Sequence, residues 1–213
     1  MLRDKKIRIL MLVALTVVLC STVIYFQLKN LPVSYVQNYS SFDKITLGGD
    51  FSLIDSKGHR RTRQEFLGKF LLIYFGYSFC PDICPLGLQN ISNTMEGLGR
   101  DREQVVPIFI TLDPQRDTPQ HLAVYATNFH PSLVMLTGTF HEIEDIKKKF
   151  HVYSARVASQ KTPSSSQDYL LDHTTLIYLI DSQGNYLESF PHSTPPETLI
   201  KALNKHFVRR SKL

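Results

Sequence analysis

Cysteine and tryptophan are the residues that this chain uses least: its 213 residues include no tryptophan and only three cysteines, Cys20, Cys80 and Cys84. Three cysteines cannot build the disulfide framework of a small secreted domain. One close pair and one distant thiol instead indicate a redox or metal-binding pair and an unrelated cysteine. Internal repeats and long low-complexity segments are also absent, and the length suits one ordinary domain plus an appendage.

Positive charge is in excess only at the two ends of the chain. The formal net charge is +5, but eight of the 24 Lys and Arg residues lie near the termini: Arg3, Lys5, Lys6, Arg8, Lys205, Arg209, Arg210 and Lys212. The other 16 of the 24 basic residues are outnumbered by 19 acidic ones. We therefore expect no basic groove on the folded part and no nucleic-acid partner.

Charged residues are missing from residue 9 to residue 26, where most side chains are apolar. Extended to Leu28, this run reaches about the 20 residues that a membrane-spanning helix needs. The basic residues before it place the N-terminus in the cytoplasm or on the equivalent side. No small-x-small cleavage site follows, which argues against a removed signal peptide, and Cys20 becomes a thiol within the membrane. We predict a cytoplasmic basic segment over 1–8, a transmembrane anchor over 9–28 and a folded part outside the cytoplasm.

The rest of the chain divides into a linker over residues 29–48 and one folded domain over 49–213. Hydrophobic periodicity, turn residues and helix-capping signals predict the elements of this domain. We expect strands at 50–55, 59–61, 69–75, 105–112, 133–136, 152–157, 174–180 and 186–190, and helices at 85–98, 119–129, 140–150 and 195–208. The early strand–helix–strand order favours parallel strands and the late hairpin adds antiparallel ones. The predicted class is α/β, with a mixed central sheet and helices on both faces.

The two neighbouring cysteines follow the apolar strand 69–75 and come directly before Pro85. Proline suits the first turn of a helix, so the pair is expected at a strand-to-helix crossing. The positive end of the helix dipole favours a thiolate, the form that attacks disulfides and binds soft metals. If the helix reaches back to Pro81, Cys80 and Cys84 lie one turn apart and their sulfurs can converge. The Cys-x-x-x-Cys spacing permits a disulfide and also suits one soft ion such as Cu(I).

A third ligand would separate metal binding from redox chemistry, and His173 is the candidate. It precedes the expected strand 174–180 and comes after a polar, serine-rich loop over 159–167. A strand entrance after a flexible loop is a usual place for a ligand. A purely structural role for this histidine stays open.

Asp113 is a candidate neighbour of the cysteines. It follows the strand 105–112, which is expected to lie beside the strand 69–75. The strand ends on one side of an open α/β sheet form its binding site, so Asp113 could approach the thiols. Turn formation by Asp113 and Pro114 is the alternative interpretation.

Three segments in this order resemble the SCO/SenC family, which comprises thioredoxin-fold, membrane-tethered copper chaperones of cytochrome c oxidase assembly. The first segment, Cys80-Pro81-Asp82-Ile83-Cys84-Pro85, resembles the family's CPDxCP motif. Asp113-Pro114-Gln115-Arg116-Asp117-Thr118 resembles its DPxRDT segment, and Asp172-His173-Thr174 its DHS or DHT segment. The resemblance covers residues 45–208 and implies a thioredoxin-like fold. One departure is Phe79, because the residue before the first cysteine is often His or a polar residue in the family.

The resemblance implies that Cys80, Cys84 and His173 bind one copper ion per chain, as Cu(I) and as Cu(II), with Asp113 flanking the site. It implies a Cys80–Cys84 disulfide in the oxidised, copper-free form. It also implies delivery of copper to the copper A site of cytochrome c oxidase subunit II during oxidase assembly. Other copper chaperones are further candidate partners, and the anchor makes the membrane another.

Two other functions fit the same residues. In a thiol–disulfide oxidoreductase that reduces the copper A cysteines, Cys80 would attack, Cys84 would resolve the mixed disulfide, and His173 would be dispensable. A copper or redox sensor is the second alternative. We expect a metallochaperone rather than an enzyme, with thiol–disulfide exchange left open.

The expected location is a bacterial inner membrane, crossed once, with the soluble domain in the periplasm. The reason is that no Arg- and Ser-rich amphipathic presequence precedes the anchor. A mitochondrial inner membrane, with the domain facing the intermembrane space, is the alternative.

Overall fold

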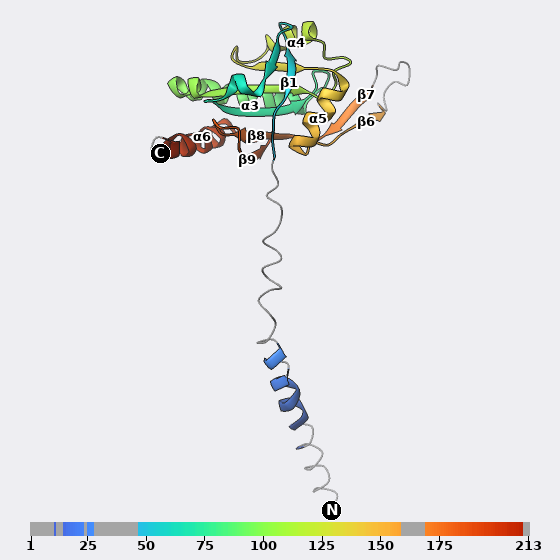
Figure 1. Ribbon diagram of the computed structural model, residues 1–213, viewed down its shortest axis with the longest axis vertical. Coiled ribbons are helices and arrows are strands. Elements are labelled where there is room, and N and C mark those ends of the chain that lie inside the picture. The colour runs from blue at the N-terminus through green and yellow to red at the C-terminus, as the bar shows by residue number, and fades with distance from the viewer. Residues whose placement is uncertain (1–10, 12–14, 24, 28–46, 159–168, 211–213) are drawn as a thin grey trace, which may run out of the picture. The chain divides into compact units, whose positions relative to one another are not determined.

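A seven-stranded sheet forms the centre of the folded unit, which spans Thr46–Leu213 in this computed structural model (Figure 1). The structure describes residues 11, 15–23, 25–27, 47–158 and 169–210. The strands of the sheet are β1 (Ser52–Asp55), β2 (Arg60–Thr62), β3 (Phe70–Gly76), β4 (Val105–Thr111), β5 (Val134–Thr137), β8 (Leu176–Ile180) and β9 (Tyr186–Pro191). From edge to edge their order is β2-β1-β5-β4-β3-β8-β9.

Parallel pairing occupies the middle of this sheet. Strand β4 runs parallel to β3 and to β5, whereas β1 runs antiparallel to β5, and β8 antiparallel to β3 and β9. All seven residues of β3 are buried, as expected for an apolar strand that is covered on both faces. The predicted mixed sheet is therefore confirmed.

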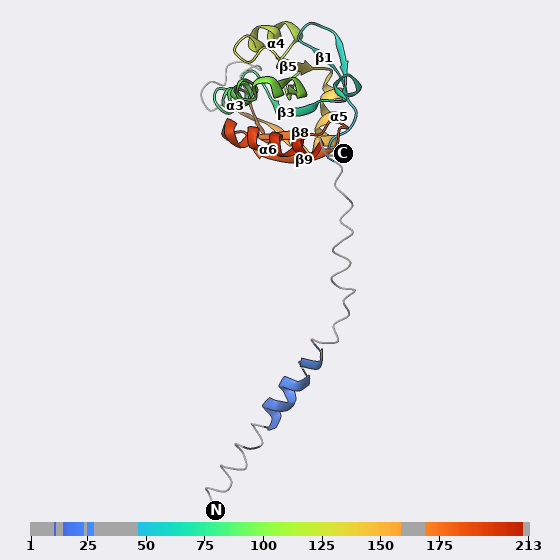
Figure 2. The same cartoon turned by 90° about the vertical axis from the view of Figure 1, so that its left-hand side faces the viewer.

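Helices cover both faces of the sheet (Figure 2). The first face carries α3 (Ile83–Gly97), α4 (Pro119–Ala126) and α6 (Pro196–Arg210), and the second carries α5 (Phe140–Phe150). Side chains alternate along a strand, so β3 supplies both cores. Phe70, Leu72 and Tyr74 join the core with α3, and Leu71, Ile73 and Phe75 join the core with α5. Two short 3-10 helices, η1 (Arg63–Phe66) and η2 (Gly99–Gln104), precede β3 and β4.

A separate two-stranded sheet is the main departure from the predicted elements. It is formed by β6 (Ser154–Ala158) and β7 (Tyr169–His173), which pair antiparallel with Ser154 opposite His173. The sequence pattern predicted a strand near β6 but none at β7, and it placed the start of the next strand at 174 rather than at Leu176. His173 therefore ends one strand instead of opening another. The hairpin lies at the periphery of the folded unit in Figure 1.

Helix α3 begins two residues earlier than Pro85, at Ile83. Cys84 thus lies in its first turn, while Cys80 comes before the bend at Pro81 and Asp82 that leads into the helix. The two cysteines are therefore not one turn apart on a continuous helix, because Pro81 and Asp82 remain outside the helix. Helix α4 ends at Ala126, three residues before the end of the predicted helix 119–129.

The predicted N-terminal segments are only partly described. Residues 15–23 and 25–27 of the proposed anchor 9–28 are helical. The segment 1–8, most of the linker 29–48 and the loop 159–167 lie outside the described residues. Among the residues that are described, no helix combines the length and the apolar character needed to cross a bilayer.

Candidate metal centre

The end of β3 brings the second cysteine against the sheet. Strand β3 finishes at Gly76, and a Cβ atom at this position would lie 2.8 Å from Sγ of Cys84 and 3.0 Å from the ring of Phe109. Glycine therefore leaves the space that the sulfur occupies. Cys84 is completely buried, and Cys80 is only 7% exposed. Both thiols are unbridged in this structure.

The two sulfurs form a hydrogen-bonded pair with unequal acidities. The hydrogen bond from the Cys84 thiol is the largest influence on Cys80 and lowers the pKa of Cys80 to about 3. The main-chain N–H groups of Asp82 and Cys84 add to this effect. Bonding to Cys80 and burial raise the pKa of Cys84. The thiolate is therefore favoured at Cys80 and the thiol at Cys84, and main-chain N–H groups at the start of α3 contribute to the difference.

Alkylation of the reduced, copper-free protein should show this asymmetry. Iodoacetamide is expected to modify Cys80 at a rate that does not fall between pH of about 8 and about 5, although an ordinary thiol has a pKa near 8.5. The thiolate is lost only as the pH falls through its lowered pKa of about 3. Peptide mapping by mass spectrometry would separate Cys80 from Cys20.

The Cys84→Ala variant is the control for this experiment. It removes the main donor to the Cys80 sulfur, so the rate at Cys80 should become pH-dependent. A rate that fell steadily below pH 8 in the wild-type protein would contradict the assignment of Cys80 as the thiolate.

His173 completes the group from a distant part of the chain. Its Nε2 lies 3.5 Å from Sγ of Cys84, across 89 positions of sequence. Its Nδ1 lies 2.8 Å from the carbonyl oxygen of Thr174, and a carbonyl can only accept, so Nδ1 carries the proton. The lone pair of Nε2 then faces the sulfurs. A ligating histidine commonly donates its other N–H to a main-chain carbonyl in this way, which fixes the ring. The edge contact with Tyr77, at 5.8 Å between ring centroids, also orients it.

The separation of the donors suits a shared ion. In a tetrahedral zinc site the metal lies about 2.3 Å from a cysteine sulfur and about 2.1 Å from a histidine nitrogen. Those two ligand atoms then lie roughly 3.6 Å from each other. The observed 3.5 Å between Cys84 and His173 is close to that value. Among the described residues, no three His, Cys, Asp or Glu side chains are yet gathered around one point. Small shifts must therefore accompany binding, and the soft sulfur donors favour Cu(I).

Asp113 lies at the edge of the site and is bound by other groups. Its carboxylate is 3% exposed, forms an ion pair with Arg116 and accepts a hydrogen bond of 2.7 Å from the Tyr169 hydroxyl. Asp113 therefore contacts Arg116 and Tyr169, and it is connected to the cysteines through these two residues. Neither Arg116 nor Tyr169 was predicted from the sequence as a site residue, although Arg116 belongs to the DPxRDT segment.

Asp117 supports the loop in front of Cys80. It is fully buried and accepts hydrogen bonds from the main-chain N–H and hydroxyl of Ser78 and from the hydroxyl of Thr111. Burial raises the pKa of Asp117, and the hydrogen bonds from Ser78 and Thr111 oppose that effect. The end of β4 is thereby tied to the cysteine loop. The sequence motif contained Asp117 but gave no sign of this role.

Three exposed apolar residues, here called the apolar rim, stand close to the two buried cysteines in the sequence. Phe79, Ile83 and Leu86 are 46%, 37% and 46% exposed. Phe79 also stacks on His121, with ring centroids 4.9 Å apart and planes 10° from parallel. The residue that departs from the family pattern therefore has a defined place beside the first cysteine.

Known proteins are similar to this chain in sequence and in fold. The model of the SCO1/SenC family matches residues 40–207. Protein sco1 of Schizosaccharomyces pombe is 41% identical over 210 residues, which cover 97% of this chain and 78% of that protein. The copper-bound structure of ScoI from Bradyrhizobium japonicum is 38% identical, with a TM-score of 0.68, and the match covers 75% of this chain and 98% of that one.

A more distant likeness concerns the fold alone. BsSco, described as a member of the Sco family of cytochrome c oxidase assembly proteins with a disulfide switch, is 22% identical. Its TM-score is 0.58, and the match covers 76% of this chain and 94% of that one.

Proposed function

The chain belongs to the SCO1/SenC family, and on that basis we propose that it is a membrane-anchored metallochaperone that delivers copper to the copper A site of cytochrome c oxidase subunit II. The thioredoxin-like fold of the family is present. The observation that carries the proposal is the approach of His173 Nε2 to within 3.5 Å of Sγ of Cys84, next to the hydrogen-bonded sulfur of Cys80. The copper-bound relative supports copper as the cargo.

Copper binding on these residues requires one proton to leave. The low pKa of Cys80 favours its thiolate, Nε2 of His173 faces the sulfurs because Nδ1 bonds the Thr174 carbonyl, and the Cys84 thiol gives up its proton as the ion arrives. The copper is Cu(I) before and after this step, so no electron is exchanged. The same residues could hold Cu(II), with the imidazole as the harder donor.

Transfer to an acceptor follows as ligand exchange. A thiolate of the acceptor forms a bond to the copper while the bond from the copper to one cysteine of this chain breaks. The ion is thereby transferred to the acceptor without being released to water. The apolar rim of Phe79, Ile83 and Leu86 is suited to a protein surface that covers the site during this exchange. A membrane tether over 9–28 would confine the encounter to the membrane face and raise the effective concentration.

Thiol–disulfide exchange is the second candidate function. Its support is the unequal pair itself, in which Cys80 has the low pKa of an attacking thiolate and Cys84 stands behind it as the resolving thiol. BsSco, with its disulfide switch, has the same fold. A Cys80–Cys84 disulfide in the oxidised, copper-free protein would serve either function.

Anaerobic titration of the full-length protein in detergent with Cu(I) tests the proposal. One equivalent is expected to bind to the reduced wild-type protein, measured by competition with a coloured chelator and by mass spectrometry. Less than a stoichiometric amount, or binding that survives loss of both cysteines, would sink the proposal. We also propose that the domain lies in the periplasm, tethered to a bacterial inner membrane, because basic residues precede the uncharged, mostly apolar run 9–26.

A further inference from the structure

The three donors come from two separately built parts of the molecule. The cysteines follow β3 of the central sheet, whereas His173 ends β7 of the two-stranded hairpin. No ladder of main-chain hydrogen bonds joins the hairpin to the central sheet in the described part of the chain. The chain joins His173 to β8 through Thr174 and Thr175, and side-chain contacts hold the rest of the hairpin against the cysteine loop.

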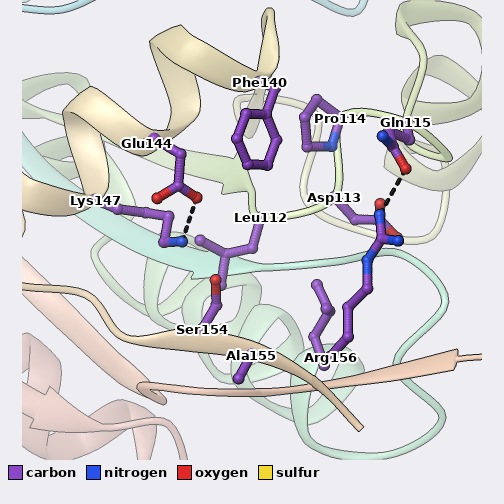
Figure 3. A pocket seen from close by; sticks show the side chains of 11 residues that line it. Leu112, Asp113, Pro114, Gln115, Phe140, Glu144, Lys147, Ser154, Ala155 and Arg156 are labelled. Atoms are coloured by element: carbon purple, nitrogen blue, oxygen red, sulfur yellow. Dashed lines mark hydrogen bonds and ion pairs between the residues drawn. The ribbon is translucent and has the colours of Figure 1, made fainter. Parts of the chain in front are cut away.

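A cavity of about 410 Å³ separates part of the hairpin from its support (Figure 3). Ser154, Ala155 and Arg156 of β6 form one wall, and the loop at Leu112–Gln115 and the start of α5 form the other. Figure 3 shows its two polar ends, the Lys147–Glu144 ion pair and the hydrogen bond from Arg156 to Gln115. Packing on this side is incomplete, so it fixes the hairpin poorly.

Arg116 makes the firmest connection between the hairpin and the cysteine loop. Its guanidinium carbon lies 3.7 Å from the centroid of the Tyr169 ring and 4.7 Å from that of Phe79. One of its N–H groups donates to the main-chain oxygen of Tyr169 at 3.0 Å, and another part of the group pairs with Asp113. A single side chain thus contacts the first strand residue of β7 and the residue before Cys80.

We propose that Arg116 is a positioning residue that holds the β6–β7 hairpin against the cysteine loop and so keeps Nε2 of His173 within coordinating reach of the sulfurs. We name Arg116, Tyr169 and Phe79 the clamp. The hydrogen bond from the Leu171 N–H to the Tyr77 hydroxyl, at 3.2 Å, lies between the clamp and His173 and depends on the same closure. Loss of a group that orients a ligand costs about 10- to 100-fold in metal affinity. One of the two tests below, the affinity measurement, depends on the proposed copper binding; the hydrogen–deuterium exchange test does not.

Two variants open the clamp in different ways. Arg116→Ala removes all its contacts but leaves the buried Asp113 carboxylate without its cation, which threatens the fold. Tyr169→Leu removes the ring and its hydrogen bond to Asp113, but it keeps the Arg116–Asp113 ion pair and the bond from Arg116 to the main-chain oxygen of residue 169. Arg156→Ala is the matched control, because Arg156 also lies over the Tyr169 ring, at 4.2 Å, yet bonds Gln115 instead of the cysteine loop.

The first measurement is hydrogen–deuterium exchange of the full-length, copper-free protein. Amides of β7, with Leu171 as the reporter, should exchange faster in Arg116→Ala and Tyr169→Leu and at the wild-type rate in Arg156→Ala. The second is the Cu(I) dissociation constant by chelator competition. It should rise about 10- to 100-fold in both clamp variants and stay at the wild-type value in the control.

The outcomes separate this proposal from the function on which it builds. A wild-type protein that fails to bind Cu(I) refutes copper delivery, while the exchange measurement still decides whether the clamp holds the hairpin. Unchanged exchange or unchanged affinity in the clamp variants overturns the proposal, as does an equal effect of Arg156→Ala. If Arg116→Ala does not fold, the result for Tyr169→Leu decides whether the clamp proposal stands.

Discussion

Replacement of His173 by alanine is expected to abolish stoichiometric copper binding while dithiol chemistry at the cysteines persists. The loss should exceed the roughly 10- to 100-fold that removal of a mere supporting group costs, because a direct ligand disappears. The hydrogen bond from the Cys84 thiol, which is the largest influence on the low pKa of Cys80, stays in this variant. Reduction of a disulfide substrate by the variant should therefore remain measurable.

The measurement compares Cu(I) titration with a disulfide-reduction assay on the same samples. His121→Ala is the matched control, since this histidine on α4 stacks on Phe79 and contacts Ser78, whereas His173 is the histidine in contact with a cysteine sulfur. It should bind one equivalent of copper. Wild-type affinity in His173→Ala would refute the three-donor site and leave an oxidoreductase as the better interpretation.

Introducing a methyl group at Gly76 is expected to damage both stability and copper binding. The new Cβ would lie 2.8 Å from the Cys84 sulfur and 3.0 Å from Phe109, closer than such contacts allow. Overpacking of a core costs about 1–3 kcal/mol of unfolding free energy. Cys84 is completely buried, so its sulfur can make room for the methyl group only by moving. That movement would disturb its contacts with Cys80 and His173. Urea denaturation and Cu(I) titration would measure the two effects.

Gly97→Ala is the control for the Gly76→Ala experiment. The nearest atom to its new methyl group is the flexible end of Ile200, and alanine favours a helix over glycine by about 1 kcal/mol. Its stability should stay close to that of the wild type or rise, with copper binding intact. If Gly76→Ala matched the control in both measurements, the close approach of Cys84 to β3 would not matter to the site.

Local patterns were sufficient for the framework of the site. The apolar run of β3 and the cysteines after it could be located because a buried strand and a helix start leave marks within a few residues. Leu88, Ile91 and Met95, which stand three or four residues apart, form a buried face of α3, as this spacing favours. The approach of His173 to Cys84 agrees with the expected ligand set, although its role toward copper remains a proposal.

Features that depend on distant partners could not be read from the sequence. Strand β7 is only five residues long and is defined by its pairing with β6, so its own residues gave no clear signal. The sequence around Arg116 indicates only a turn that begins at Asp113 and Pro114. Folding brings Arg116 to Tyr169, which is 53 positions away in the sequence. The start of α3 was misplaced because Pro85 is compatible with more than one position in the first turn.

The hydrogen bond between the two sulfurs also bears on oxidative damage. A peroxide that reaches Cys80 oxidises its sulfur to a sulfenic acid, and the Cys84 thiol already lies against that sulfur. Condensation of the two forms the disulfide and releases water before a second oxygen can be added. The chain would thereby stop at the reversible first step of sulfur oxidation, where a cellular reductant can restore it, and avoid the sulfinic and sulfonic forms that cannot be repaired in the same way.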